Sequence, residues 1–135
     1  MQKYFSSIEV AELTKTHIGC FKAWLYEGYI SPLCDQDTST TNVRWARHDI
    51  RVIAFFKYIL DKGYSRKKAA EIACNYGEFG ENAHYFLHVN DKNYYLSEDL
   101  AGVEMIMMSY IRSANNINIY VLDNILKDLF SNKEE

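Results

Sequence analysis

Apolar residues in the first half of the chain recur every three or four positions, the spacing of helices with one buried face. Ser6 and Glu9 have the arrangement of a capping box, so we expect a short helix to begin there. A second helix is expected to begin at Thr16 or His17 and to end before Gly28, a residue suited to the left-handed conformation after a helix. Two short helices joined by a tight turn are a helix-turn-helix candidate.

Two longer helices are predicted next, over residues 50–62 and 66–76. Gly63 is expected to end the first, and Ser65 to cap the second. Residues 33–43, which lie between the second expected helix and these two longer ones, are polar and rich in Thr, Asp and Ser. This composition predicts a loop or a short β-hairpin.

The second half of the chain combines the period of a strand with that of a helix. Residues 84–89 and 92–96 flank a short turn and predict a β-hairpin. A helix is expected to begin at residues 97–99, and a last helix is expected over residues 118–130. The predicted fold class is therefore mainly α, with a helix-turn-helix followed by a small α+β module of one β-hairpin and two helices.

The charge of the chain divides in the same way. Residues 1–74 hold eleven Lys and Arg against eight Asp and Glu, whereas residues 75–135 hold four against ten. The first half thus carries a net charge of +3 and the second −6, within a total of −3. This split predicts two domains with these boundaries, with any phosphate contact confined to the first. Chance variation among solvated faces is the alternative.

Several classes of protein are disfavoured by the sequence. No run of 18 apolar residues exists, and the N-terminus carries charges where a signal peptide needs an apolar core, so we expect a cytoplasmic chain without a membrane partner. Cys20, Cys34 and Cys74 are widely spaced and form no C-x-x-C, so no metal site is predicted. No Gly-rich phosphate loop or nucleophile elbow occurs, so we expect no enzyme and no cofactor.

Three motifs follow one another in the first half. They are FKAWLYEGYISP at residues 21–32, RWARHDI at residues 44–50 and LDKGYS at residues 60–65. In these motifs the chain, over residues 4–74, resembles the winged helix-turn-helix DNA-binding domain of the MerR family of transcriptional regulators. The resemblance extends to the related excisionase-like winged helices.

The resemblance implies a sequence-specific DNA-binding protein, a transcriptional regulator whose second helix reads the major groove while its wing contacts the backbone or the minor groove. The residues that it assigns to double-stranded DNA are Thr16, His17, Lys22, Trp24, Tyr26, Arg44, Trp45 and Arg47. Core packing is the alternative role for Trp24, a helix cap for His17, and a solvated surface position for Lys22.

The second half departs from typical members of that family. Residues 75–135 show no long heptad helix, and no cysteine follows Cys74 to match the metal-sensing members. The apolar faces of the last two expected helices are either core or the seam of a homodimer. The residues expected at that seam are Met105, Ile119, Leu122, Ile125, Leu126 and Leu129. The effector, if the chain has one, is not predicted.

Two other functions remain open at this point. The acidic total charge and the atypical second half fit a protein-interaction or inhibitor module that keeps the winged-helix scaffold without binding DNA. An excisionase-like role, in which the protein shapes DNA, is a variant of the main hypothesis.

Overall fold

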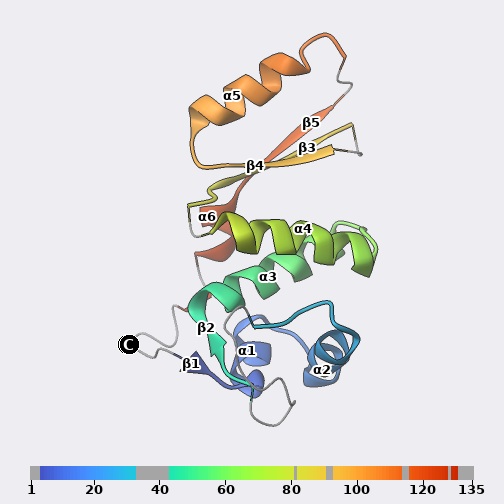
Figure 1. Ribbon diagram of the computed structural model, residues 1–135, viewed down its shortest axis with the longest axis vertical. Coiled ribbons are helices and arrows are strands. Elements are labelled where there is room, and N and C mark those ends of the chain that lie inside the picture. The colour runs from blue at the N-terminus through green and yellow to red at the C-terminus, as the bar shows by residue number, and fades with distance from the viewer. Residues whose placement is uncertain are drawn as a thin grey trace.

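The computed structural model describes residues 4–32, 43–80, 82–90, 93–113, 116–127 and 129–130. These residues form a mainly helical, elongated molecule with two small sheets (Figure 1). Two short helices and a two-stranded sheet lie at one end, and two longer helices cross the middle. A three-stranded sheet and a further helix form the other end.

The first two helices are α1 (Ser7–Leu13) and α2 (Ile18–Glu27), which confirms the predicted helical pair. A capping box begins α1: Glu9 N–H donates to Ser6 Oγ at 3.2 Å, and Ser6 N–H donates to Glu9 Oε1 at 3.0 Å. Gly28 ends α2 in the left-handed conformation with a φ of 85°. The start of α1 and the end of α2 are therefore set by the residues that the sequence singles out.

The two-stranded sheet consists of β1 (Tyr4–Phe5) and β2 (Trp45–Ala46), paired antiparallel. It joins the start of the described chain to the segment that leads into the third helix. Most of the predicted wing, residues 33–42, lies outside the described residues. The observed order up to this point is therefore strand, helix, helix, strand.

Helices α3 (Arg47–Asp61) and α4 (Arg66–Phe79) pack against each other across the middle of the molecule. Asp49 at the start of α3 is buried, and its Oδ2 accepts a hydrogen bond from Ala46 N–H at 2.9 Å. Ser65 caps α4 as predicted, because its Oγ accepts from the Lys68 N–H. The expected domain boundary after residue 74 falls inside α4.

The second sheet contains β3 (Tyr85–Val89), β4 (Asn93–Ser97) and β5 (Ile117–Val121), all antiparallel in the order β4-β3-β5. The predicted hairpin is β3 and β4, which confirms that part of the second half. Helix α5 (Leu100–Ser109) follows β4 and is capped by Asp99, whose Oδ1 accepts from the Gly102 N–H at 2.8 Å.

The prediction of one helix over residues 118–130 is wrong in its first part. This segment begins in β5 and continues as the short helix α6 (Leu122–Leu126). Ile119 and Val121 are separated by one residue and lie on the same face of β5, the period of a strand. The prediction instead used the three-residue step from Ile119 to Leu122, which also fits a helix.

The main buried core is continuous from the first sheet to Phe86 of β3, whereas the buried Leu87, Val89 and Val103 lie outside it. Phe55 on α3 is fully buried, and its ring centroid lies 4.9 Å from that of Tyr76 and 5.3 Å from that of Phe86. At the other end, the Phe5 and Phe130 centroids are 5.9 Å apart. Residues from both expected domains therefore share one core.

Four residues that were expected at a dimer seam belong to this core. They are Leu122, Ile125, Leu126 and Leu129. The first is buried and the others are partly buried, because α6 packs against α3 of the same chain. Met105 and Ile119 differ, since their exposed fractions are 72% and 42%. The assignment of these four residues to a seam is therefore corrected to core packing, and a seam at Met105 and Ile119 stays a prediction.

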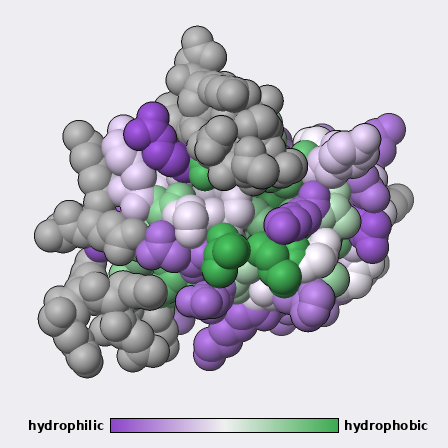
Figure 2. Space-filling view, turned by 90° about the horizontal axis from the view of Figure 1, so that it is seen from below, coloured by the Kyte–Doolittle hydropathy of each residue, from purple (hydrophilic) through white to green (hydrophobic). Residues whose placement is uncertain are grey.

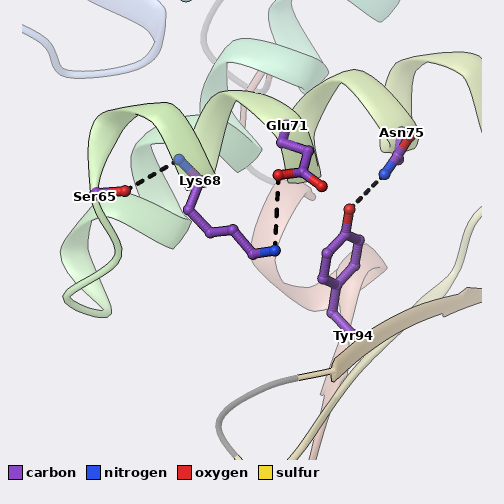
Figure 3. A network of polar contacts seen from close by, with 5 residues as sticks. All are labelled: Ser65, Lys68, Glu71, Asn75 and Tyr94. Carbon is purple, nitrogen blue, oxygen red and sulfur yellow. Dashed lines mark hydrogen bonds and ion pairs between the residues drawn. The ribbon is translucent and has the colours of Figure 1, made fainter.

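Polar contacts also tie α4 to the second sheet (Figure 3). Asn75 of α4 donates a hydrogen bond to the Tyr94 hydroxyl of β4. Lys68 Nζ lies 3.7 Å from Glu71 Oε2 and 5.2 Å from the centre of the Tyr94 ring. The Lys68 ammonium is thus held by a carboxylate and an aromatic face of its own chain.

Candidate nucleic-acid interface

One face of α2 is fixed to the core by two large aromatic side chains. The rings of Phe21 and Trp45 meet edge to face with centroids 5.4 Å apart. Trp24 meets Phe56 of α3 in the same way at 5.0 Å. Edge-to-face contacts of this kind are favourable and specific in geometry, so they set the rotation of α2 about its axis.

The opposite face of α2 is exposed to solvent. Gly19, Lys22, Ala23 and Tyr26 occupy positions i, i+3, i+4 and i+7, and all four are exposed. The exposed fraction of Tyr26 is 87%. Ala23 is small, so a bound surface could approach the helix closely there, whereas the His17 ring lies beside Gly19. Lys22 supplies a positive charge, and Tyr26 supplies a flat ring with a hydroxyl group.

The N-terminus of α2 carries the two polar residues that the sequence singled out. His17 caps the helix, because its Nδ1 accepts a hydrogen bond from the Gly19 N–H at 3.0 Å. The residue is nevertheless exposed, so the cap leaves part of the ring accessible. The Thr16 hydroxyl is 2.9 Å from the Thr14 hydroxyl and is half-buried. Of the two, His17 is the better placed to contact a ligand.

Both tryptophans assigned to DNA are core residues, which corrects those two assignments. Trp24 is buried against Phe56, the packing role that was its alternative. Trp45 is fully buried, and its Nε1–H donates to Ser7 Oγ at 3.0 Å. A buried indole usually finds such a partner for its N–H group. Neither ring is available to a nucleic acid in this structure.

The two predicted arginines flank β2 and stack on aromatic rings. Arg44 is exposed, and its guanidinium carbon lies 5.5 Å from the centre of the Tyr4 ring. Arg47 is half-buried, with its guanidinium carbon 4.4 Å from the centre of the Phe130 ring. Stacking leaves the edge of a guanidinium able to donate hydrogen bonds. Arg44 therefore fits the predicted contact better than Arg47.

Sequence reasoning missed one arginine of this cluster. Arg51 lies one helical turn after Arg47 on α3, and its guanidinium carbon is 5.6 Å from the centre of the same Phe130 ring. The spacing of four residues between two arginines was the available signal. The position of Phe130 beside these two arginines could not be predicted, because Phe130 lies far from them in the sequence.

A further cation contacts the last turn of α2. Arg66 at the start of α4 lies 3.7 Å from Glu27, between Nη1 and Oε2, with both side chains substantially exposed. Ion pairs in such exposed positions contribute little to stability. The contact does place a guanidinium beside the C-terminal end of the exposed α2 face.

Figure 2 views the molecule from the end that carries α1, α2 and the first sheet. Hydrophilic side chains predominate among the coloured ones and surround a small hydrophobic group. Ile8 of α1 is exposed at this end, since the buried stripe of α1 runs through Val10 and Ala11. The surface is thus mainly polar with limited apolar area.

The described part of the chain contains no group of three His, Cys, Asp or Glu side chains placed to hold a metal ion. None of its helices is both long and apolar enough to cross a membrane.

Comparison with known proteins adds no family assignment. No protein-family model matches the chain, and no curated protein is detectably similar to it.

Proposed function

We propose that this chain is a sequence-specific DNA-binding protein, a transcriptional regulator of the MerR type that acts in the cytoplasm. The observation that carries the proposal is α2, a capped helix fixed on one face by Phe21 and Trp24 and exposed on the other with Lys22 and Tyr26. A single α-helix fits the major groove of B-form DNA. In this proposal α2 is the reading helix.

The chemistry of the exposed α2 face supports this role. A lysine ammonium can donate to guanine O6 and N7 in the major groove or to a phosphate. The Tyr26 hydroxyl can donate to a phosphate, and its ring can lie against a sugar. Ala23 leaves room for the duplex between these groups. His17, at the helix start, is exposed, and its ring lies beside Gly19 of the same face.

The segment around β2 supports a second, less specific contact. Arg44 is exposed and supported by the Tyr4 ring, and Arg47 and Arg51 lie around Phe130. Guanidinium groups that contact phosphates fix the register of a protein on DNA without distinguishing its sequence. We also propose that the order of strands and helices in this half is that of a winged helix, and that the segment leading into β2 is its wing.

The test is a titration of the full chain with genomic DNA fragments at two salt concentrations, followed by selection of the tightest site. Lys22→Ala should weaken binding to that site by about 1–3 kcal/mol and relax its base preference. Arg44→Ala should weaken binding to selected and scrambled duplexes alike and reduce the salt slope by about one unit.

Lys127→Ala is the matched control, because it removes one exposed positive charge at the C-cap of α6 instead of one from α2. The control should bind the selected site as the parent does, within the small effect of total charge. If folded Lys22→Ala and Arg44→Ala variants also bind as the parent does, the proposal fails for α2 and β2.

The alternative is a protein-interaction or inhibitor module without DNA binding. The observation that favours it is the exposed apolar side of α5, which includes Met105 and Met108, in the acidic half of the chain. Apolar patches of this kind mark interfaces with other proteins. A parent chain that shows no salt-dependent DNA affinity, yet associates with protein through α5, would favour this function.

A further inference from the structure

A polar pocket of about 140 Å³ lies between the end of α3 and the second sheet. Lys62 forms the C-cap of α3, and Gly63 follows it in a left-handed conformation with a φ of 101°. The chain turns there, so that Lys62 and Tyr64 both line the pocket. None of its described lining residues belongs to α2 or β2, so the pocket is separate from the proposed DNA contacts.

The opposite wall of the pocket is one face of the second sheet. Phe86 and His88 are two residues apart on β3 and therefore share this face. Tyr120 and Asn118 stand opposite them on β5. The same face packs against α3, because the Phe86 ring contacts a phenylalanine of that helix. Phe86 and Ile59 of α3 are almost completely buried, so they give the pocket an apolar floor.

Lys62 brings a positive charge to the pocket. Its Nζ lies 4.9 Å from the centre of the Tyr58 ring and 5.3 Å from that of the Tyr120 ring. Aromatic faces attract an ammonium group without neutralising it. No carboxylate of the described residues forms an ion pair with Lys62, and no other Lys, Arg, Asp or Glu is among the described lining residues. An anion in the pocket would therefore meet one positive charge.

Neutral hydrogen-bond donors lie beside this charge. The Tyr64 hydroxyl is 2.6 Å from a ring nitrogen of His88. When the hydroxyl donates to one nitrogen of a neutral imidazole, the other nitrogen carries the hydrogen and can donate to a ligand. Asn118 is exposed, and its carboxamide adds two N–H donors. The pocket thus combines one ammonium group with several uncharged donors.

We propose that this pocket binds a small monocarboxylate with a flat apolar body. The carboxylate accepts hydrogen bonds from Lys62, Asn118 and the His88 ring, and the apolar body lies on the floor of Phe86 and Ile59. Apolar walls with a few placed polar groups are typical of small-molecule sites. The volume equals the share of about five water molecules in the liquid, which suits a body of one ring.

The single ammonium group is what favours a monocarboxylate over a phosphate. One positive charge balances one negative charge, whereas a phosphate dianion would keep an unbalanced charge next to the apolar floor, which is unfavourable. The proposal goes beyond DNA binding and does not depend on it, because α2 and β2 take no part in the pocket.

The experiment is an NMR titration of the full chain with benzoate at constant pH, observed at the histidine ring protons. The His88 signals should shift and saturate with a dissociation constant of about 1 mM, as expected for a ligand of one ring. The signals of His17, on α2, should not follow the same curve. Benzamide has the same shape without the charge and should bind about tenfold more weakly, and inorganic phosphate should not displace benzoate.

Lys62→Gln should weaken benzoate binding about tenfold and leave benzamide binding unchanged, because it removes the charge alone. Lys67→Gln is the matched control, since Lys67 is an exposed lysine in the first turn of α4 and does not line the pocket. The control should bind both compounds as the parent does.

The absence of a saturable shift at His88, or an equal shift at His17, would overturn the proposal. Equal affinities for benzoate and benzamide, or an unchanged benzoate affinity in Lys62→Gln, would show that the charge of Lys62 is not used and would also overturn it. Displacement of benzoate by phosphate at lower concentration would overturn the assignment of a carboxylate. Far-ultraviolet circular dichroism of each variant establishes that a loss of binding is not a loss of the fold.

Discussion

Helices α2 and α5 are equal in length, at ten residues each, and both are capped by a side chain, yet their exposed faces differ in chemistry. In α2 the large apolar residues Phe21 and Trp24 are buried, and Lys22 is exposed. In α5 the methionines are exposed and Val103 alone is buried. The same local structure thus presents a polar face at one end of the molecule and an apolar face at the other.

The difference indicates which kind of partner each helix fits. A polar face with a lysine and a tyrosine gains little by leaving water for an apolar surface, but it can exchange water for phosphate oxygens and base edges. An apolar face of methionines gains by burial, at roughly 25 cal/mol for each Å² removed from water. Met is also flexible enough to adapt to a neighbouring side chain.

The largest expected effect tests whether these two ends are independent. Phe55→Ala removes a fully buried ring that contacts both Tyr76 and Phe86, so it should destabilise the protein by about 3–5 kcal/mol. Because the main core joins the α2 end to β3 of the second sheet, unfolding should remain a single transition. The measurement is chemical denaturation followed by tryptophan fluorescence, which reports on the α2 end, and by circular dichroism.

Coincident curves from the two probes are expected for the parent and for Phe55→Ala. Separate transitions would mean that the two ends unfold independently. Helices α2 and α5, with their different exposed faces, would then belong to two separate domains. The exposed Phe79, changed to Ala, is a matched control on α4 and should lower stability by much less.

A second prediction separates buried from exposed aromatics within the proposed DNA-binding end. Trp45→Phe removes the indole donor to Ser7 Oγ and leaves a small void, so it should cost about 2–4 kcal/mol of stability. Tyr26→Ala should change stability by less than about 0.5 kcal/mol, since the side chain is exposed. In DNA titrations we expect the reverse: Tyr26→Ala should lower the affinity more than Trp45→Phe does.

Paired melting and DNA-binding measurements on these two variants check the reversal. Tyr26→Ala should lower DNA affinity in a fully folded chain, while Trp45→Phe should bind DNA normally below its melting temperature. If Trp45→Phe is stable but binds DNA poorly, Trp45 contacts DNA, and its role is not core packing alone.

The smallest expected effect concerns pH at the α5 end. The Tyr95 and Tyr110 hydroxyls are hydrogen-bonded to each other, and this bond, with partial burial, raises the pKa of Tyr95 above its ordinary value of about 10. The raised pKa favours the neutral form in the folded state. Its contribution to stability is therefore complete below about pH 10 and is lost as the pH rises through the raised pKa.

Tyr110→Phe should bring the pKa of Tyr95 down toward the ordinary value, because the main cause of the shift is removed. The measurement is an NMR titration of ring-labelled tyrosine in the parent and in the Tyr110→Phe variant. An unchanged pKa of Tyr95 in the Tyr110→Phe variant would show that the hydroxyl pair is not the cause.

The elements at the α2 end could be predicted because their boundaries are encoded locally. Ser6 with Glu9, Ser65 and Gly28 each act within a few residues, so the sequence alone places α1, α4 and the end of α2 well. Trp24 and Trp45 could not be assigned in the same way. Whether an aromatic residue on a short helix or strand is buried depends on Phe56 and Ser7, which are distant in sequence.

The α5 end was harder to predict, because its apolar residues satisfy two periods at once. Ile119 is two residues from Val121 and three from Leu122, so strand and helix patterns overlap where β5 passes into α6. The pairing of β5 with β3 decides between them, and that pairing joins segments far apart in the chain. The same lack of local information made Leu122 and Ile125 look like a seam.

The contact between Phe5 and Phe130 has a consequence for synthesis of the chain. The rings of the two residues meet beside Arg47, where α3 begins. Contacts between residues so far apart form late and slow the folding of small proteins. While the chain is still being made on the ribosome, the start of α3 therefore lacks one of its aromatic neighbours until Phe130 has emerged. A nascent chain truncated before that point would leave Phe5 without this cover and would be an early target for proteolysis.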